Sequence, residues 1–422
     1  MTNAILRGKP DAGNPHVRFD EGEVASAKPR RGSLLYKMKK CLFVCGGCLL
    51  AFLSSANQPD VAKWDSRMAL KDAVITNGVK WIDGRNLPIE GRAFNDTERY
   101  YDRLPANVTT NVNGGVRAMK RHTSGMLFRF ATDSRTLHFR WKPTSASLSM
   151  DHMPATGVSG IDVYRWNAAK GRWLYAATGR ITDARKGGSL TLNWTPGTPC
   201  IVNLPLYNGV ESFELGIEPK ATVEAVAHRS GVERPVVFYG TSITQGGCAS
   251  RPGLAFVNRI GRDLDVPVVG LGFSGSGVME LEMSELLAHV DASCYVLDCL
   301  WNMSLREKDQ PGRSVEANYE PFIRNLRAKR PNVPIVMAEQ CDVHLYGPSE
   351  KDLFVRKLYE KLVAEGWKGL VYLPKGEMFT GDGEGTVDGC HPNDLGMQSM
   401  ARAFGQAVRR ALGISGPHSV SR

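Results

Sequence analysis

The sequence predicts two successive domains: a β-sandwich, followed by an α/β domain with a doubly wound parallel sheet of five strands. Three observations lead to this prediction. The chain has 422 residues, more than one ordinary domain needs. From about Trp81 to Val226 apolar and polar residues alternate with a period of two. From Pro235 onward the pattern changes to short apolar runs separated by amphipathic stretches.

The N-terminal part of the chain contains a candidate export signal. Residues 1–37 are polar and have no apolar period, so we expect them to be disordered. The segment 38–56 has Lys39 and Lys40, then a short apolar run and small residues, which is the pattern of a signal peptide. We therefore expect translation to start at Met38 and the mature protein to be secreted or periplasmic, without a stable membrane span.

The expected N-terminal β-sandwich domain covers residues 75–230. Segments 126–132 and 136–142 alternate on either side of the polar turn 133–135, which predicts a β-hairpin. Gly, Pro, Asn and Asp separate the alternating segments, and a helical period is scarce. Two further alternating segments are 189–195 and 212–217.

The expected catalytic domain covers residues 234–412, after a linker at 227–234, and a frayed tail follows at 413–422. Each of its five apolar runs precedes a helical stretch, which favours a parallel sheet covered on both faces. The apolar runs are 236–240, 266–273, 294–300, 333–339 and 370–374, and the helical stretches are roughly 253–264, 278–290, 313–329, 349–365 and 394–412. In such sheets ligands bind at the carboxyl ends of the strands.

Residues that could take part in catalysis follow four of these five runs. Ser242 follows the first run, and Gly275 lies in a glycine turn after the second. Asn302 follows the third run, and Asp388 and His391 follow the fifth. A hydroxyl, a base with a carboxylate partner, and backbone and amide donors are the groups that acyl transfer needs. Taken singly, each is an ordinary turn or helix-cap residue, but all four strand ends face one sheet edge.

Residues 270–275 also fit the dinucleotide-binding pattern G-x-G-x-x-G, and Asp298 ends the next apolar run. However, this motif follows the second strand of the domain and leaves Ser242 and the Asp388–His391 pair unexplained. We therefore expect no cofactor. Positive charge is scattered despite the net charge of +10, and no basic stripe is interleaved with aromatic residues, so no nucleic-acid partner is expected.

Six cysteines lie beyond the candidate signal segment, and none has the spacing of metal ligands, so no metal is expected. Cys294 and Cys299 lie in an apolar run and are expected to be buried thiols. Cys248 and Cys390 each lie beside a candidate motif, and a disulfide between them is compatible with export.

The four motifs resemble those of the SGNH hydrolases, also called GDSL-like esterases. FYGTSITQGG resembles the nucleophile block, GFSGSG and LDCLWNMS the second and third blocks, and DGCHPND the last. The resemblance implies Ser242 as nucleophile and Asp388 and His391 as its triad partners. It also implies an oxyanion hole made by the backbone of Ser242, the backbone of Gly275 and the side chain of Asn302.

The resemblance extends over about residues 75–412. GIDVY, residues 160–164, is similar to the G-x-D-L-Y element of a β-domain that precedes some of these esterases. The implied fold is a flavodoxin-like sheet after a jelly-roll-like sandwich. Two departures stand out: Thr241 replaces the acidic residue of G-D-S, and the block around Asn302 lacks the usual Gly before and Asp after the asparagine.

The expected function is that of an exported serine esterase without cofactor, with acetyl esters of carbohydrate as the expected substrates. The loop 147–160 is expected either to reach over the site or to pack between the domains. The alternatives are a non-catalytic carbohydrate-binding protein and a dinucleotide-binding oxidoreductase.

Overall fold

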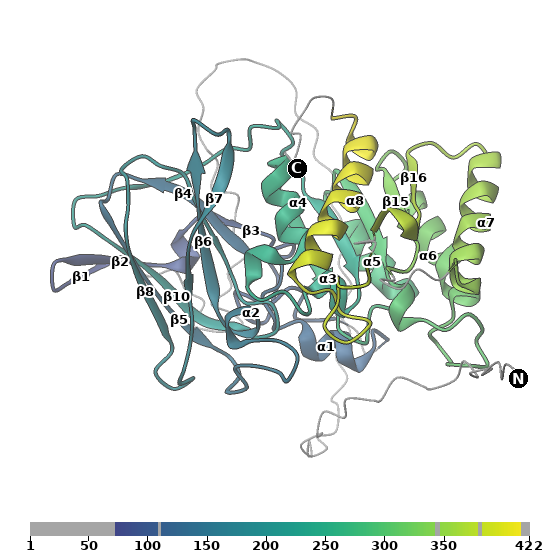
Figure 1. Cartoon of the computed structure of the whole chain (residues 1–422), viewed down its shortest axis with the longest axis horizontal. Coiled ribbons are helices and arrows are strands. Elements are labelled where there is room, and N and C mark those ends of the chain that lie inside the picture. Colours follow the sequence, from purple (N-terminus) through teal and green to yellow (C-terminus); the bar gives the residue numbers. More distant parts are fainter. Residues whose placement is uncertain (1–71, 109–110, 342–346, 379–381, 415–422) are drawn as a thin grey trace, which may run out of the picture. The chain divides into compact units, whose positions relative to one another are not determined.

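The computed structural model describes residues 72–108, 111–341, 347–378 and 382–414 (Figure 1). All of them belong to one compact unit, 56–422. The predictions for residues 1–37 and 38–56, and most of the predicted tail, lie outside the described residues.

The N-terminal region is built from two antiparallel sheets. The first has the strand order β1-β2-β10-β5-β8, and the second β11-β4-β9-β6-β7, with β3 beside β4. The first sheet comprises β1 (Val74–Thr76), β2 (Val79–Asp83), β10 (Val210–Ile217), β5 (Thr136–Pro143) and β8 (Gly188–Asn193). The second comprises β11 (Val223–Ala225), β4 (Leu127–Thr132), β9 (Cys200–Asn203), β6 (Ile161–Asn167), β7 (Arg172–Gly179) and β3 (Ile89–Glu90). Two short helices, α1 (Gly114–Met119) and α2 (Ala155–Val158), lie between strands.

Aromatic side chains from both sheets form one core. The ring centroids of Phe128 on β4 and Phe213 on β10 are 4.5 Å apart, and Trp141 on β5 is buried in the same cluster. The indole N–H of Trp141 donates to the Ser159 carbonyl at 3.0 Å, so the buried ring leaves no donor unpaired. The period-two pattern therefore predicted an antiparallel, β-rich region correctly.

The predicted hairpin around residues 133–135 is wrong, because β4 and β5 belong to different sheets. The polar groups of this turn bond to the segment after β10. Asp133 accepts from the backbone N–H of Thr222 at 2.7 Å, and the Ser134 hydroxyl accepts from that of Glu218 at 3.1 Å. The connection is thus a corner between two sheets, and alternation alone cannot distinguish a corner from a hairpin.

The second half contains the predicted parallel sheet, with strand order β13-β12-β14-β15-β16. This is the doubly wound order of flavodoxin-like folds. Its strands are β12 (Val236–Gly240), β13 (Val268–Gly272), β14 (Cys294–Asp298), β15 (Ile335–Ala338) and β16 (Leu370–Leu373). The helices are α3 (Ser242–Gln245), α4 (Phe256–Leu264), α5 (Leu281–His289), α6 (Val315–Lys329), α7 (Glu350–Ala364) and α8 (Asp394–Leu412). Single 3-10 turns are η3 (Gly84–Asn86), η4 (Pro252–Leu254), η5 (Leu300–Asn302) and η6 (Lys375–Met378).

Helices cover both faces of the parallel sheet, as the continuous apolar runs predicted. Val237 and Tyr239 of β12 share a buried cluster with α5, α6 and α7. Val236 and Phe238 share the other cluster with α4 and α8. Burial of every residue of β12 explains why it lacks the polar alternation of the N-terminal strands. Within the ranges that the structure describes, no helix is long and apolar enough to cross a membrane.

Candidate active site

Ser242 lies at the start of α3, in the turn that follows β12. Thr241 is the N-cap, and its hydroxyl accepts from the backbone N–H of Ile243. Gly246 ends this single turn of helix at φ 107°, a left-handed conformation that favours glycine. Gly240 has no room for a side chain, because a Cβ there would lie 2.1 Å from the Thr244 hydroxyl. The small residues of this stretch therefore produce a sharp strand-to-helix turn that holds Ser242 at the sheet edge.

Ser242, His391 and Asp388 form a continuous hydrogen-bond chain. The Ser242 Oγ lies 2.9 Å from His391 Nε2, and His391 Nδ1 lies 2.7 Å from Asp388 Oδ2. The other carboxylate oxygen of Asp388 accepts from the backbone N–H groups of Cys390 at 3.0 Å and His391 at 2.7 Å. Burial alone would raise the pKa of Asp388, but these hydrogen bonds outweigh it, and the pKa lies below its usual value. An ionised Asp388 accepts a hydrogen bond from the Nδ1–H group of His391. The unprotonated Nε2 can then accept a hydrogen bond from the Ser242 hydroxyl.

The predicted oxyanion donors lie at the ends of three neighbouring strands, β12, β13 and β14. Gly275, in the turn after β13, has φ 62°, and its carbonyl accepts from the Arg313 guanidinium at 2.7 Å. Asn302 ends the 3-10 turn after β14. Its side-chain amide donates to the Phe273 carbonyl at 3.3 Å, which ties it to the glycine turn. The structure thus brings all five predicted site residues to one edge of the sheet.

Gln245 is a buried support of this edge that the sequence did not single out. Its side-chain Oε1 accepts from the backbone N–H of Ser274 at 3.0 Å, and its side-chain Nε2 lies 2.9 Å from His122 Nδ1. Burial, and to a lesser degree the charge of Arg103, lowers the pKa of His122 to about 3, so this imidazole is neutral. The position of Gln245 within the serine block FYGTSITQGG was the available signal.

The N-terminal region also supports the candidate site. Arg103 is buried and donates to the carbonyls of Gly270 at 3.1 Å and Gly272 at 2.7 Å, at the end of β13. Burial lowers the pKa of Arg103 to about 9, and its guanidinium lies 4.5 Å from the Phe273 ring centroid. The hydroxyl of Ser124 donates to the backbone carbonyl of Gln245 at 2.6 Å. An isolated Arg and Ser give no sequence signal for such long-range contacts.

Asp162 of the GIDVY segment is buried beside the loop that follows α3. It accepts from the side chain of Arg251 at 2.7 Å and from the backbone N–H of Gly253 at 2.9 Å. Its other oxygen accepts from the Asn203 amide at 2.8 Å. This aspartate therefore links strand β6 to the loop that continues from Ser242.

The loop 147–160 does both things that the sequence left open. Met153 is buried in the cluster of α4 and α8, so part of the loop packs between the two regions. His152 is exposed, and its ring centroid lies 5.4 Å from that of His391. The loop therefore places one side chain directly beside the predicted catalytic base.

No disulfide joins Cys248 and Cys390. Burial, assisted by the charge of Asp388, raises the pKa of Cys248 to about 12. Cys390 is half-buried, and Cys294 and Cys299 are buried as predicted.

The glycines of the G-x-G-x-x-G stretch have a packing role. A Cβ at Gly270 would lie 3.0 Å from the Gly125 Cα, and one at Gly272 would lie 2.1 Å from the backbone nitrogen of Gln245. These close approaches account for both glycines without a dinucleotide.

Comparisons with known proteins agree with this architecture. A sequence model of the GDSL-like lipase/acylhydrolase family matches residues 233–409. A model of the GxDLY N-terminus of SGNH-hydrolase-type esterases matches residues 79–223. No curated protein is significantly similar to the chain in sequence.

Three solved structures share the fold over most of the chain. A GDSL-like lipase from Bacteroides ovatus is 27% identical, with a TM-score of 0.69 over 80% of this chain and 99% of that one. The salicylyl-acyltransferase SsfX3 of a tetracycline biosynthetic pathway is 17% identical, with a TM-score of 0.61 over 80% and 98%. A family two carbohydrate esterase from Cellvibrio japonicus is 14% identical, with a TM-score of 0.51 over 79% and 98%. Residues 233–409 therefore belong to the GDSL-like lipase/acylhydrolase family of carboxylic ester hydrolases, and residues 79–223 match the GxDLY-type N-terminus of SGNH-hydrolase-type esterases.

Proposed function

We propose that the protein is a serine esterase that cleaves small carboxylic esters through an acyl-enzyme. The observation that supports this most strongly is the hydrogen-bond chain from Ser242 through His391 to Asp388, at 2.9 Å and 2.7 Å. A serine hydroxyl is a weak nucleophile by itself, and a histidine at hydrogen-bond distance is the base that activates it.

In the proposed mechanism, Ser242 Oγ attacks the ester carbonyl while His391 Nε2 takes its proton. Asp388 holds the ring in the required tautomer and stabilises the imidazolium that forms. The backbone N–H groups of Ser242 and Gly275 and the Asn302 amide donate to the developing oxyanion. His391 then protonates the leaving alcohol, and it activates the water that hydrolyses the acyl-enzyme.

The proposed substrates are acetyl esters of carbohydrate. The family supports ester hydrolysis, and the carbohydrate esterase from Cellvibrio japonicus, which shares the fold, makes acetylated sugars the first substrates to test. We also propose that the protein acts outside the cytoplasm, on the basis of the segment 38–56. Mass spectrometry of the mature protein should then find an N-terminus near Asn57, whereas an intact chain from Met1 would contradict export.

The test is hydrolysis of a chromogenic acetate ester by the wild-type protein, the Ser242→Ala variant and a matched control, Ser189→Ala. Ser189 lies exposed on β8, in the N-terminal region. We expect turnover by the wild type and by Ser189→Ala, and none by Ser242→Ala, with unchanged circular dichroism in all three. Wild-type-like turnover by folded Ser242→Ala would contradict the proposal. A wild type that binds sugars but hydrolyses no ester would favour the non-catalytic alternative.

A further inference from the structure

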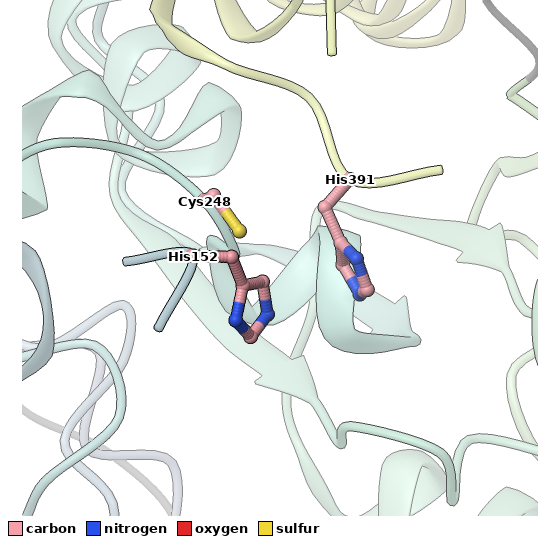
Figure 2. A group of neighbouring side chains, drawn as sticks. All are labelled: His152, Cys248 and His391. Atoms are coloured by element: carbon pink, nitrogen blue, oxygen red, sulfur yellow. The ribbon is translucent and has the colours of Figure 1, made fainter. Parts of the chain in front are cut away.

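His152, Cys248 and His391 lie together although they come from three distant segments. His152 belongs to the loop between β5 and β6, Cys248 to the loop after α3, and His391 to the loop before α8. One ligand atom from each of them lies within 4.8 Å of the other two. Figure 2 shows the three side chains as neighbours, with the thiol of Cys248 next to His152. The spacing of these residues in the sequence gives no hint of this cluster, which exists only in the folded protein.

Two imidazoles and a thiolate are a ligand set that suits zinc and similar transition metals, while Mg²⁺ and Ca²⁺ prefer oxygen ligands. A tetrahedral zinc site places its ligand atoms roughly 3.3–3.8 Å apart, given bond lengths of about 2.0–2.3 Å. The cluster must therefore contract by about 1 Å, and the exposed side chain of His152 is free to rotate toward the other two.

His391 already has the outer partner that metal-bound histidines usually have. Its Nδ1 is hydrogen-bonded to Asp388 at 2.7 Å, and a carboxylate at this position fixes the ring and makes the other nitrogen a better metal ligand. The nitrogen left for a metal is Nε2, the one that also lies 2.9 Å from the Ser242 hydroxyl.

We propose that His152, Cys248 and His391 bind a zinc-class divalent cation, and that this cation switches the esterase off. Binding places the metal on His391 Nε2, so this nitrogen can no longer take the proton of Ser242. The Cys248 thiol loses its proton to the solvent as the sulfur–metal bond forms, and a water molecule takes the fourth position. The binding site stands on its own, whereas the inhibition rests on the proposed catalytic function.

The cation would also connect the N-terminal region to both loops of the catalytic site, because His152 comes from that region. A ligand that binds only the folded state raises the free energy of unfolding by RT ln(1 + L/Kd), where L is the free ligand concentration, so the melting temperature rises with ligand concentration. Metal binding can therefore be followed without any assay of activity.

The experiment is a titration of the full chain with Co²⁺, a spectroscopic substitute for Zn²⁺, followed by competition with Zn²⁺. In the wild type we expect tetrahedral d–d absorption, a sulfur-to-cobalt charge-transfer band and a rise in melting temperature, all reversed by a chelator. Mg²⁺ should produce none of these. The same titration by Zn²⁺ should inhibit hydrolysis with the affinity found by absorption.

Variants separate the ligands from their neighbours. Cys248→Ser should lose the charge-transfer band, while Cys390→Ser, which alters the adjacent half-buried thiol, should keep it. His152→Ala should weaken metal binding by more than the roughly 10–100-fold typical of losing an outer partner. The control His289→Ala, at an exposed histidine of α5, should bind as the wild type does.

The outcomes distinguish this proposal from the esterase proposal. An active wild type that binds Co²⁺ without a charge-transfer band, or equally well without His152, would overturn the metal site and leave the esterase intact. A wild type that binds Co²⁺ as described but hydrolyses no ester would leave the metal site standing and remove the inhibition.

Discussion

Individual side chains at the sheet edge have distinct expected roles, which kinetics can separate. Asp388 acts on the base and Asn302 on the oxyanion, so their removal should lower kcat by different factors. Asp388→Asn should lower kcat by about 10⁴-fold, because the required tautomer is lost. Asn302→Ala should lower kcat by about 10²–10³-fold, because one of three donors is lost.

Both variants are compared with Asn193→Ala, at an exposed asparagine of β8, in kcat and KM for an acetate ester. Wild-type kcat in Asn302→Ala would exclude this side chain from the oxyanion hole.

Because the pKa of Asp388 is lowered, this carboxylate stays ionised at every pH above its ordinary pKa of about 4. Any loss of activity between pH 7 and pH 5 must therefore come from another group.

At this scale, the sequence singled out residues in short motifs that follow strands of the parallel sheet. Ser242 comes directly after β12, whereas Asp388 and His391 lie in the loop between β16 and α8. The topology of a parallel sheet brings the carboxyl ends of its strands to one edge. Arg103 could not be predicted, since its significance comes from buried contacts with distant carbonyls. The role of Gln245 was missed although it lies within the serine block, because its contact with the Ser274 N–H appears only in the folded protein. The proximity of His152 to His391 depends in the same way on the path of a long loop.

The strand-to-helix turn between β12 and α3 leads to a prediction at the scale of elements. In Gly240→Ala, the new Cβ would lie 2.1 Å from the Thr244 hydroxyl and 2.4 Å from the Asp298 carbonyl of β14. The turn must shift to make room, which should cost about 1–3 kcal/mol of stability and lower kcat by displacing Ser242.

The control is Gly376→Ala, since a Cβ at Gly376 has nothing within 4 Å. Denaturant unfolding and kcat are measured for both variants. An unchanged kcat in Gly240→Ala would mean that the turn tolerates a side chain and does not fix the position of Ser242.

The parallel strands were predictable as elements, because strands buried on both faces have to be apolar throughout. The connection between β4 and β5 was not, because alternation shows which face of a strand is buried but not which strand lies beside it. The strand pairing, which places β4 and β5 in different sheets, distinguishes the sheet-to-sheet corner from a hairpin, and Asp133 and Ser134 bond this corner to the segment after β10.

At the scale of the whole molecule, a buried charge network joins the N-terminal region to the catalytic region. Asp265, which ends α4, lies 2.8 Å from the guanidinium of Arg129 on β4 and 3.0 Å from that of Arg229. Burial would raise the pKa of Asp265, but the His228 imidazole, whose Nδ1 lies 3.8 Å from Asp265 Oδ1, and the charge of Arg129 outweigh it, so the pKa lies well below its usual value.

A carboxyl group whose pKa is lower in the folded state stabilises the protein above its unfolded pKa of about 3.9, and this contribution is lost as the pH falls. Asp265→Asn keeps the shape and the left-handed backbone conformation of φ 53° but removes the charge. We expect it to lower the free energy of unfolding by about 3 kcal/mol at pH 7, because Arg129 loses its buried partner.

Unfolding is measured from pH 7 to pH 3 for both proteins. The difference in free energy of unfolding between wild type and Asp265→Asn should become smaller as the pH falls through the region near 4 and below. If the two proteins already have equal free energies of unfolding at pH 7, the charge of Asp265 contributes nothing to the stability of the whole molecule.

The most direct test of the central claim is labelling with a fluorophosphonate, which reacts with a serine activated by a neighbouring base. The wild-type protein is treated until activity is lost, digested, and analysed by mass spectrometry. We predict one modification per chain, on Ser242, and no modification of the His391→Ala variant under the same conditions, because the hydroxyl then lacks its base. Loss of activity with the label on another residue, or full activity with Ser242 labelled, would contradict the account.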